Sequence, residues 1–344
     1  MRVILLAGEK AQHSNGSTLR LRSLERYFGG LGHTVDIEHF APRGRKFPLQ
    51  YRYLLRGKHQ RNLKNLVSNY DLVVVANPSL AVVHSVIASK ANMLDVCDSM
   101  ISMLKFRSRN ESITNFLKSC LSALYLTLYI RKHNAVTYIT LEDSQQDGLI
   151  NKRVKTAIIP NSCNVLLAGV PPTRAQNEPL VVGFIADLEY SLNQIQYNYI
   201  LRELLPSILE FGFVLHLFGK KPQNFQVPSG VHHWGFIPSI LDVYKRIDIS
   251  LCPDFHGFGF KNKVQESLLA SRPIVTTPLG ARGQAHVEGL IVNTTASEMI
   301  ISLRKLSDRN LLRNLSQQMK KANSNRLETH EDSTWLDDIF FSEN

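Results

Sequence analysis

The chain has 344 residues, enough for two domains of ordinary size. Hydrophobic residues make up 44% and charged residues 20%, so the composition excludes global disorder. The formal net charge of +11 lies in the first half: residues 1–175 hold 24 Lys and Arg against 11 Asp and Glu, whereas residues 176–344 hold 16 against 18. We therefore expect the first half to face something anionic.

The first half alternates short apolar runs with segments of helical spacing. The pattern predicts strands at 2–7, 34–40, 71–76, 135–140 and 156–160, and helices at 19–28, 80–89 and 113–131. The run 71–76 (DLVVVA) is apolar throughout, as in a strand that a parallel sheet buries on both faces. Residues 1–165 are therefore predicted to form a doubly wound α/β domain.

The same pattern restarts after a loop-rich linker at 169–179. Further strands are predicted at 180–186, 213–218, 247–252 and 273–277, and helices at 193–211, 240–246, 262–271 and 297–306. The fold class is thus α/β, with a second Rossmann-like doubly wound domain over 176–325 that faces the first across a cleft. We expect the tail, 326–344, to pack back on the first domain.

Cysteine and apolar patterning place the chain in a reducing compartment. Cys97, Cys120, Cys163 and Cys252 are scattered, with no spacing typical of a metal site, so no metal or other cofactor is expected. The apolar stretch Ser119–Ile130 has twelve residues, short of the ~20 that a bilayer requires. With no export signal, the sequence predicts a cytoplasmic protein that touches a membrane from that side at most.

The segment 251–290 carries the clearest chemistry. A predicted strand ends at Cys252, a loop with Gly257 and Gly259 follows, and a helix then begins with Lys261 and Lys263 in its first turn. Two glycines let backbone N–H groups approach a ligand, and a helix N-terminus attracts anions. Lysines oppose the helix dipole there unless an anion lies between them and the helix, so the pattern predicts a diphosphate site.

Glu266 lies about one helical turn after Lys263, on the same side of the predicted helix. A carboxylate would repel phosphates, so its place beside them favours hydrogen bonds with ribose hydroxyls instead. A strand at 273–277 and a second glycine turn, Gly280 to Gly283, complete the segment.

This segment resembles the nucleotide-sugar site of family-4 glycosyltransferases, within glycosyl transferases group 1, which are retaining enzymes of the GT-B fold. The resemblance rests on the run G-x-G-x-K-x-K-x-x-E, on PIVTT at 273–277 and on GARG at 280–283. It implies a UDP- or GDP-sugar donor, no metal, and transfer to a hydroxyl acceptor, such as a glycan or a lipid-linked sugar of cell-envelope polysaccharide or glycolipid synthesis. The donor-binding residues it implies are Gly16, Asn193, Gly257, Phe258, Gly259, Lys261, Lys263, Val264, Glu266, Gly280 and Arg282.

Weaker matches lie elsewhere. Gly16 falls in a segment like the family's first glycine loop, and Asp95–Ser99 resembles a D-x-x-D-S segment at a strand end. Asp98 and Lys263 are the catalytic candidates, although Asp98 is equally suited to cap a helix N-terminus.

The sequence also departs from the family pattern. Phe258 stands where many members have the first acidic residue of Glu-x7-Glu, and 186–196 has neither Lys nor Arg. A divergent member is indicated, and two alternatives stay open: an inactive GT-B scaffold that binds another transferase, or a nucleotide-sugar epimerase.

The basic excess is densest between Phe40 and Tyr70, where no acidic residue occurs. The pattern fits either a solvated helix or a surface that meets an acceptor and anionic lipid headgroups. A nucleic acid partner is disfavoured because no recognisable nucleic-acid-binding module accompanies the run. The residues assigned to acceptor or membrane contact are Arg43, Arg45, Lys46, Arg52, Arg56, Lys58 and Arg61.

Overall fold

The computed structural model describes residues 1–9, 16–43, 50–110, 112–162, 165–168, 170–171, 178–284 and 287–326. The chain divides by its internal packing into two compact units. The first unit, Met1–Ser162 together with Phe258–Phe260, is called the first lobe, and the second unit, Cys163–Gly257 and Lys261–His330, is called the second lobe.

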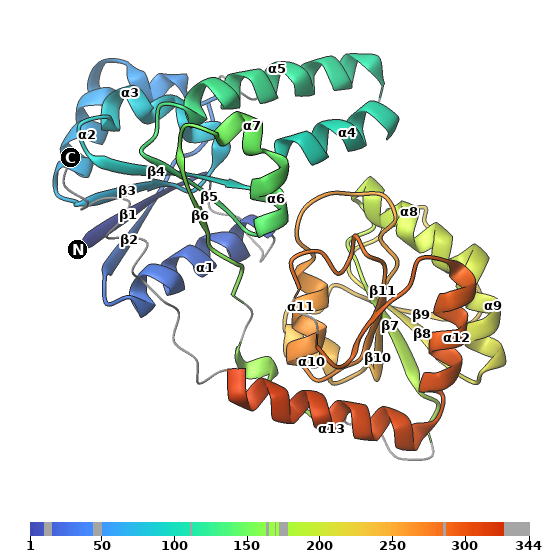
Figure 1. The fold of residues 1–344 in the computed structure, drawn as a ribbon. Coiled ribbons are helices and arrows are strands. Elements are labelled where there is room, and N and C mark those ends of the chain that lie inside the picture. Colours follow the sequence, from blue (N-terminus) through green and yellow to red (C-terminus); the bar gives the residue numbers. More distant parts are fainter. Residues whose placement is uncertain are drawn as a thin grey trace. The chain divides into compact units, whose positions relative to one another are not determined.

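The first lobe contains one sheet of six parallel strands in the order β2-β1-β3-β4-β5-β6 (Figure 1). Its strands are β1 Arg2–Ala7, β2 Thr34–His39, β3 Leu72–Val75, β4 Ala91–Cys97, β5 Ala135–Tyr138 and β6 Lys155–Ile158. Its helices are α1 Gly16–Gly30, η1 Arg52–Leu55, α2 Gly57–Ser68, η2 Pro78–Val83, α3 His84–Ile87, α4 Met100–Asn110, α5 Ile113–Ile130, α6 Leu141–Gln146 and α7 Gly148–Asn151.

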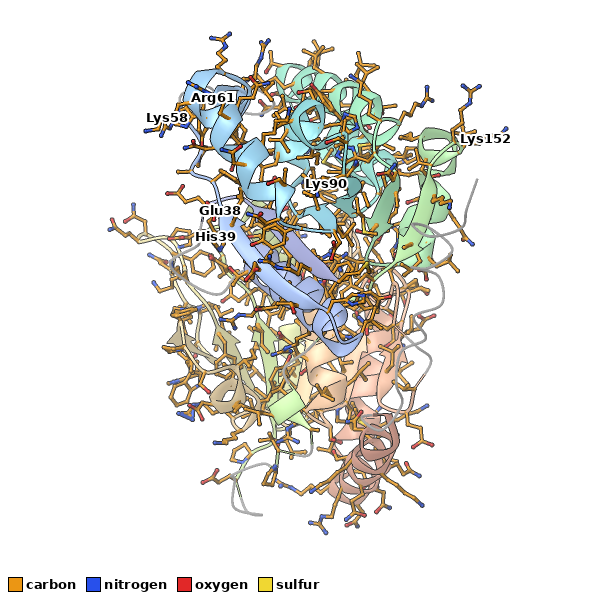
Figure 2. All side chains as sticks on the ribbon, turned by 90° about the vertical axis from the view of Figure 1, so that its left-hand side faces the viewer. Glu38, His39, Lys58, Arg61, Lys90 and Lys152 are labelled. Atoms are coloured by element: carbon orange, nitrogen blue, oxygen red, sulfur yellow. The ribbon has the colours of Figure 1, made fainter. Side chains whose placement is uncertain are left out.

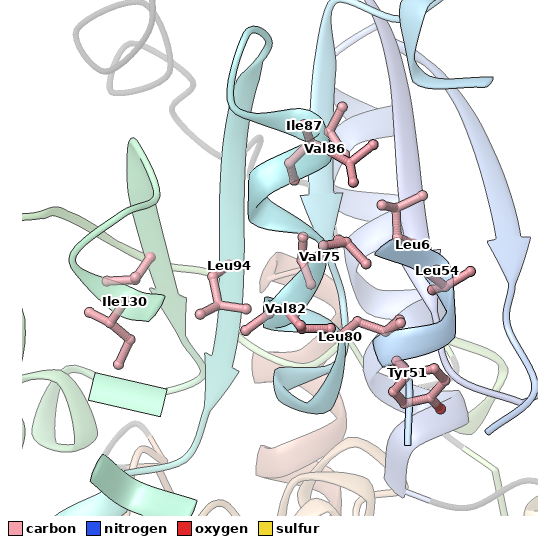
Figure 3. Close-up of a cluster of buried hydrophobic side chains, with 14 of the residues drawn as sticks. Leu6, Tyr51, Leu54, Val75, Leu80, Val82, Val86, Ile87, Leu94 and Ile130 are labelled. Atoms are coloured by element: carbon pink, nitrogen blue, oxygen red, sulfur yellow. The ribbon is translucent and has the colours of Figure 1, made fainter. Parts of the chain in front are cut away.

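Both faces of this sheet are covered, which explains why the central strands β1 and β3 are almost entirely apolar. Val3 and Leu5 point to one face and pack with Leu24 and Phe28 of α1. The alternate residues of β1 point to the other face, into a larger cluster with η1, α2, η2 and α5 (Figure 3). This two-sided packing confirms the doubly wound arrangement for the first lobe.

The second lobe repeats the plan with a different strand order, β12-β11-β10-β7-β8-β9, again with every pair parallel. Its strands are β7 Val181–Ile185, β8 Val214–Phe218, β9 Val231–Gly235, β10 Ile249–Cys252, β11 Ile274–Thr276 and β12 Leu290–Val292. Its helices are η3 Val165–Leu167, α8 Ser191–Tyr199, η4 Ile200–Leu204, α9 Leu205–Glu210, α10 Ile240–Tyr244, α11 Asn262–Leu269, α12 Ala296–Leu306 and α13 Arg309–Arg326.

One sheet face of the second lobe packs against α8, α9 and α12, and the opposite face packs against α10, α11 and α13. The predicted helix 193–211 is present, but η4 is a π-helical turn within it. Pro206 follows and has no N–H for a helical bond, while Leu205 N–H reaches back to Ile200 O, so the helix widens at this point.

Several elements were not predicted from the sequence, among them helices α2, α4, α6 and α7 and three strands. The sequence did not predict β4, β9 or β12, because polar residues interrupt the first two and the third has three residues. The apolar stretch at Ser119–Ile130 belongs to a longer helix, α5, whose 18 residues have a mean hydropathy of 1.2. By length and composition alone α5 could cross a membrane, a test that the core helices of many proteins also pass, so the absence of a membrane span in this stretch stays a prediction.

Candidate functional site

The second-lobe site lies where the strand order reverses. Chain connections leave β7 toward β8 and leave β10 toward β11, in opposite directions along the sheet. Ligands of open α/β sheets bind outside the carboxyl ends of the strands at such a switch point. The segment 251–290 begins at the carboxyl end of β10, so its predicted anion-binding loop lies at the switch point of this sheet.

The loop after β10 needs glycine for two local reasons. A Cβ atom on Gly257 would lie 3.0 Å from both carboxylate oxygens of Asp254, closer than side chains normally pack. Gly259 has a φ of +74°, in the left-handed region that L-residues rarely adopt. The backbone path of the loop therefore favours glycine at position 259 whatever it binds, and a side chain at position 257 would have to displace Asp254.

Lys261 is held by an acidic partner that the sequence motif did not include. Its Nζ lies 2.8 Å from Asp254 Oδ2, and the two side chains are only 14% and 1% exposed. Lys261 occupies the cap position of α11 and provides no side-chain acceptor for the first helical N–H groups. A cation thus stands at the positive end of a helix dipole, a combination that attracts an anionic ligand.

Lys263 is the most exceptional cation of the site. Its Nζ atom is buried, has no hydrogen-bond partner among the residues that the structure describes, and lies 5.1 Å from the ring centroid of Phe184 on β7. Burial lowers the pKa of Lys263, because the charged form is poorly solvated there. An ammonium without a hydrogen-bonding partner is costly to bury, so a bound anion would be strongly favoured at this position.

Glu266 follows one turn later on α11. Burial raises its pKa to about 7, while the positive charge of Lys263 and a hydrogen bond from the Tyr244 hydroxyl act in the opposite direction. That hydroxyl carries one proton and lies 3.0 Å from Lys263 O, so Lys263 O and Glu266 are alternative acceptors for it. Near neutral pH this carboxyl group is therefore poised between its charged and neutral forms.

The second glycine turn is fixed to β10 and β11 by threonine hydroxyls. Thr276 Oγ1 donates to Cys252 O at 2.8 Å, and Gly280 N–H donates to Thr277 Oγ1 at 3.1 Å. A Cβ on Gly280 would lie 2.1 Å from Thr276 Oγ1, so only glycine fits. Arg282 is partly buried in the turn that follows.

Two further predicted donor residues have structural roles in the second lobe. Val264 is fully buried in the core with Leu268 and Met319, so only its backbone is available to a ligand. Asn193 donates from its side-chain amide to Asp187 O at 2.8 Å and thereby closes the loop between β7 and α8. Their donor contacts stay predictions, as does that of Phe258 in the glycine loop.

In the first lobe, Gly16 begins α1 and is exposed, whereas Asp98 is partly buried just after β4. Asp98 is not the N-terminal cap of α4. Ser99 Oγ accepts from Ser102 N–H, and Asp147 on the neighbouring α6–α7 segment accepts from Met100 N–H and Ile101 N–H. The capping alternative for Asp98 is therefore wrong, and its catalytic role stays a prediction.

Beside Asp98 lies a buried ion pair that the sequence did not reveal. Arg20 Nη2 lies 2.7 Å from Asp95 Oδ1 and Arg20 Nε lies 2.9 Å from Asp95 Oδ2, with both side chains buried. Arg20 also donates to Asn161 Oδ1, and Thr137 donates to Asp95. Burial alone would raise the pKa of Asp95, but the Arg20 charge and these hydrogen bonds hold it below its usual value.

The basic residues assigned to acceptor or membrane contact are exposed where the structure describes them. Arg52 is on η1, Arg56 precedes α2, and Lys58 and Arg61 point outward from α2, while Leu63 and Val67 of the same helix are buried (Figure 2). Arg43 lies over the Tyr53 ring, 4.5 Å from its centroid. Arg45, Lys46 and residues 327–344 of the tail lie outside the described residues.

No group of three or more His, Cys, Asp or Glu side chains that would suit a metal ion occurs among the described residues. The candidate site contains the cations of Lys261 and Lys263, the carboxyl groups of Asp254 and Glu266, a helix N-terminus and two glycine turns, a chemistry suited to a phosphorylated ligand with hydroxyl groups.

Comparison with known proteins gives concordant results. Residues 179–309 match the model of the family described as Glycosyl transferases group 1. No curated protein matches the sequence at a significant level.

Among solved structures, HepE of Anabaena in complex with UDP and glucose is similar, with a TM-score of 0.63, 13% sequence identity, and coverage of 94% of this chain and 95% of that one. WaaG, a glycosyltransferase involved in lipopolysaccharide biosynthesis, has a TM-score of 0.65 at 12% identity, with complete coverage of both chains. TarM has a TM-score of 0.58 at 16% identity and covers 82% of this chain and 57% of its own. At these identities the likeness establishes the fold. The chain therefore has the GT-B fold, and its second lobe, over residues 179–309, matches the glycosyl transferases group 1 family.

Proposed function

We propose that the protein is a glycosyltransferase that moves a sugar from a nucleotide-diphosphate donor to a hydroxyl acceptor. The observation that carries this proposal is the buried Lys263 ammonium at the N-terminal end of α11. It has no hydrogen-bond partner in the described part of the chain and lies one helical turn from the buried Glu266. A diphosphate would give the Lys263 ammonium an anionic hydrogen-bond partner, and the hydroxyl groups of a ribose would donate hydrogen bonds to Glu266. The family match over the same residues and the complex of HepE with UDP and glucose agree with this assignment.

In this reaction the bond between the sugar and the diphosphate breaks, and negative charge grows on the leaving phosphate oxygens. Lys263, Lys261 and the N–H groups at the start of α11 are preorganised to stabilise that charge. The glycine turns let the backbone approach closely, and the Glu266 carboxylate orients the nucleotide through its ribose. None of these roles requires a metal ion.

Two further parts of the proposal concern the stereochemistry of the transfer and the nature of the acceptor. Retention of the anomeric configuration, with Asp98 as the catalytic candidate of the first lobe, follows from the family-4 resemblance of residues 251–290. A glycan or lipid-linked acceptor is supported by the exposed basic residues of the first lobe. A role in cell-envelope polysaccharide or glycolipid synthesis on the cytoplasmic side is supported by WaaG, which is involved in lipopolysaccharide biosynthesis.

A donor screen tests the proposal. UDP-, GDP- and ADP-sugars are incubated with the purified protein, with and without candidate acceptors, and the released nucleotide is measured. We expect turnover of at least one donor, stimulated by acceptor and lost in Glu266→Ala. Lys245→Ala is the control, since its ion pair with Asp242 lies on the surface of α10.

Two outcomes would favour the alternatives. If no donor turns over although nucleotide binds, the protein is an inactive scaffold. If the sugar is converted without acceptor-dependent release of nucleotide, it is an epimerase. Equal turnover by wild type and Glu266→Ala would refute the site assignment.

A further inference from the structure

Helix α5 of the first lobe carries two apolar faces. One face is buried and holds Ser119, Ala123, Leu126 and Ile130, of which the last two belong to the lobe's main hydrophobic cluster. The other face is exposed. It consists of five large aliphatic residues, each more than half exposed: Ile113 (78%), Leu117 (56%), Leu121 (66%), Leu124 (59%) and Leu128 (57%).

These five residues form a continuous stripe. Their spacings of four, four, three and four residues confine them to an arc of about 80° when each residue advances by about 100°. The buried residues of α5 centre on the opposite side of the helix. We call the five residues the α5 stripe. Scattered surface leucines are normal, but an unbroken row along 18 residues of one helix indicates a binding surface.

Cations surround the α5 stripe. Lys118 lies within α5, Arg131 and Lys132 follow its last turn, and Lys105 and Arg109 lie on the adjacent α4, all of them exposed. Between Asp98 and Glu142 the sequence has one acidic residue, Glu111, which lies outside the described residues. The helix therefore combines a hydrophobic row with a positively charged border.

Tyrosines line one flank of the stripe. The rings of Tyr125 and Tyr129 lie 4.6 Å apart, and Lys132 Nζ lies over the Tyr129 ring at 5.1 Å from its centroid. Burial raises the pKa of Tyr125, with a smaller opposing effect from Arg52 of η1. The guanidinium group of Arg52 is therefore close enough to Tyr125 to influence its ionisation. The hydroxyl of Tyr125 is buried within the lobe, so of the two rings only Tyr129, with Lys132 over it, suits a boundary between apolar and aqueous surroundings.

We propose that α5 lies in the plane of an anionic lipid bilayer surface, with the α5 stripe inserted among the acyl chains and its cations on the headgroups. Interfacial helices combine such an apolar face with flanking Lys and Arg. A second copy of the same face is a poorer partner, because it would bring like charges together. The inference is independent of the proposed sugar transfer, since it concerns binding to lipid alone.

The helix is long enough to span a bilayer, but its packing argues for an in-plane arrangement. Leu126 and Ile130 contribute to the cluster that covers one face of the first-lobe sheet. A spanning α5 would withdraw these side chains from the sheet and expose the apolar surface beneath. An in-plane helix keeps the lobe intact and buries only the stripe.

Vesicle co-sedimentation tests this proposal. The full-length protein is mixed with preformed vesicles of phosphatidylcholine alone or with about a third phosphatidylglycerol, at low and high salt. We expect sedimentation with the anionic vesicles, weakened by salt, and a loss of at least about tenfold in partitioning for the double variant Leu121→Glu/Leu124→Glu. The matched control is Leu141→Glu/Leu149→Glu, which changes two exposed leucines of α6 and α7 in the same lobe, and we expect it to bind like wild type.

Four results would overturn the proposal. They are absence of wild-type binding to any vesicle, an equal loss in the control, resistance of the bound protein to alkaline carbonate extraction, and a concentration-dependent dimer that only the stripe variant abolishes without any lipid binding. Circular dichroism of each variant confirms that the fold is retained. Since no sugar nucleotide is present, failure here leaves the donor screen unaffected.

Discussion

Lys261 Nζ lies 2.8 Å from the buried carboxylate of Asp254, so the second-lobe site contains a cation that is already neutralised before any ligand binds. A diphosphate that reaches the N-terminal end of α11 must compete with this carboxylate for Lys261 and also meets its negative charge. Asp254 therefore weakens nucleotide binding in our account, and it keeps Lys261 from repelling Lys263 in the unliganded protein.

The first prediction concerns this carboxylate. Asp254→Asn removes the negative charge beside the diphosphate, and we expect the affinity for UDP or GDP to rise by about fivefold, with steeper salt dependence. Calorimetric titration at two salt concentrations measures this. Asp242→Asn is the control, because its partner Lys245 is a surface residue of α10. Weaker binding by Asp254→Asn would show instead that the carboxylate positions Lys261 for the ligand.

The second prediction concerns pH. The pKa of Glu266 is raised from 4.5 to about 7, so the folded protein retains a proton that the unfolded chain releases at lower pH. This contribution to stability is complete below pH 4.5 and is lost as the pH rises through 7. We therefore expect Glu266→Gln to stabilise the unliganded protein at pH 8, by up to about 3 kcal/mol in urea unfolding, and not at pH 4.5.

Ligand binding should show the opposite trend for the same residue. Ionised Glu266 accepts hydrogen bonds from ribose, so wild-type nucleotide affinity should fall as the pH drops below 7, and Glu266→Gln should bind weakly at every pH. A stabilising effect of Glu266→Gln that is equal at both pH values would contradict the raised pKa.

The structure explains why the sequence predicted some of this site and not the rest. The strand, glycine loop and helix around residues 251–269 follow from local periodicity and from the φ requirement of Gly259, which depend only on neighbouring residues. The ionisation of Glu266 depends on how deeply α11 is buried by its lobe. Similarly, Asp254 lies against Gly257, and its backbone carbonyl accepts a hydrogen bond from the Thr277 hydroxyl. The sequence pattern around residue 254 does not indicate these contacts.

In the first lobe, too, the features that depend on neighbouring residues were predictable and those that depend on distant contacts were not. The apolar strand β3 was predictable from its composition, whereas β4 was not, because Asn92 and Asp95 interrupt its apolar pattern. Asp95 is tolerated in this buried strand because it pairs with Arg20, 75 residues away, whereas the side-chain amide of Asn92 donates locally to Lys90 O. Long-range pairs of this kind leave no periodic signal.

The third prediction tests the Arg20–Asp95 pair. Arg20→Met leaves a buried carboxylate without its cation, and we expect a loss of about 3 kcal/mol or more in the free energy of unfolding. Arg22→Met is the matched control on the same helix, since Arg22 is exposed, and should change stability by less than about 0.5 kcal/mol. Urea denaturation followed by circular dichroism measures both. Equal stability of the two variants would refute a structural role for the pair.

The fourth prediction concerns His133, which is 5% exposed and lies against His84 with 4.9 Å between ring centroids. Burial lowers the pKa of His133 to about 4, so the unfolded chain binds a proton at a pH where the folded protein does not. Stability from this group is complete above pH 6.5 and declines as the pH falls toward 4.

Replacing His133 with phenylalanine removes the titrating group and so isolates its contribution to the pH dependence of stability. In His133→Phe the loss of stability between pH 7 and pH 5 should be smaller than in wild type by about 2 kcal/mol. The control His59→Phe changes an exposed histidine of the same lobe and should leave the pH dependence as it is. An unchanged pH dependence in His133→Phe would contradict the account of His133.

The central claim is that the second lobe binds a nucleotide diphosphate through Lys263 and the N-terminal end of α11. Calorimetric titration of UDP and of GDP into wild type and Lys263→Met tests it most directly, with Lys245→Met as the control. The account predicts saturable binding of at least one nucleotide to wild type and to the control, and a loss of at least about tenfold in Lys263→Met, whose fold should be at least as stable because a buried ammonium has been removed. Binding that Lys263→Met leaves unchanged, or no binding of either nucleotide to wild type, would contradict it.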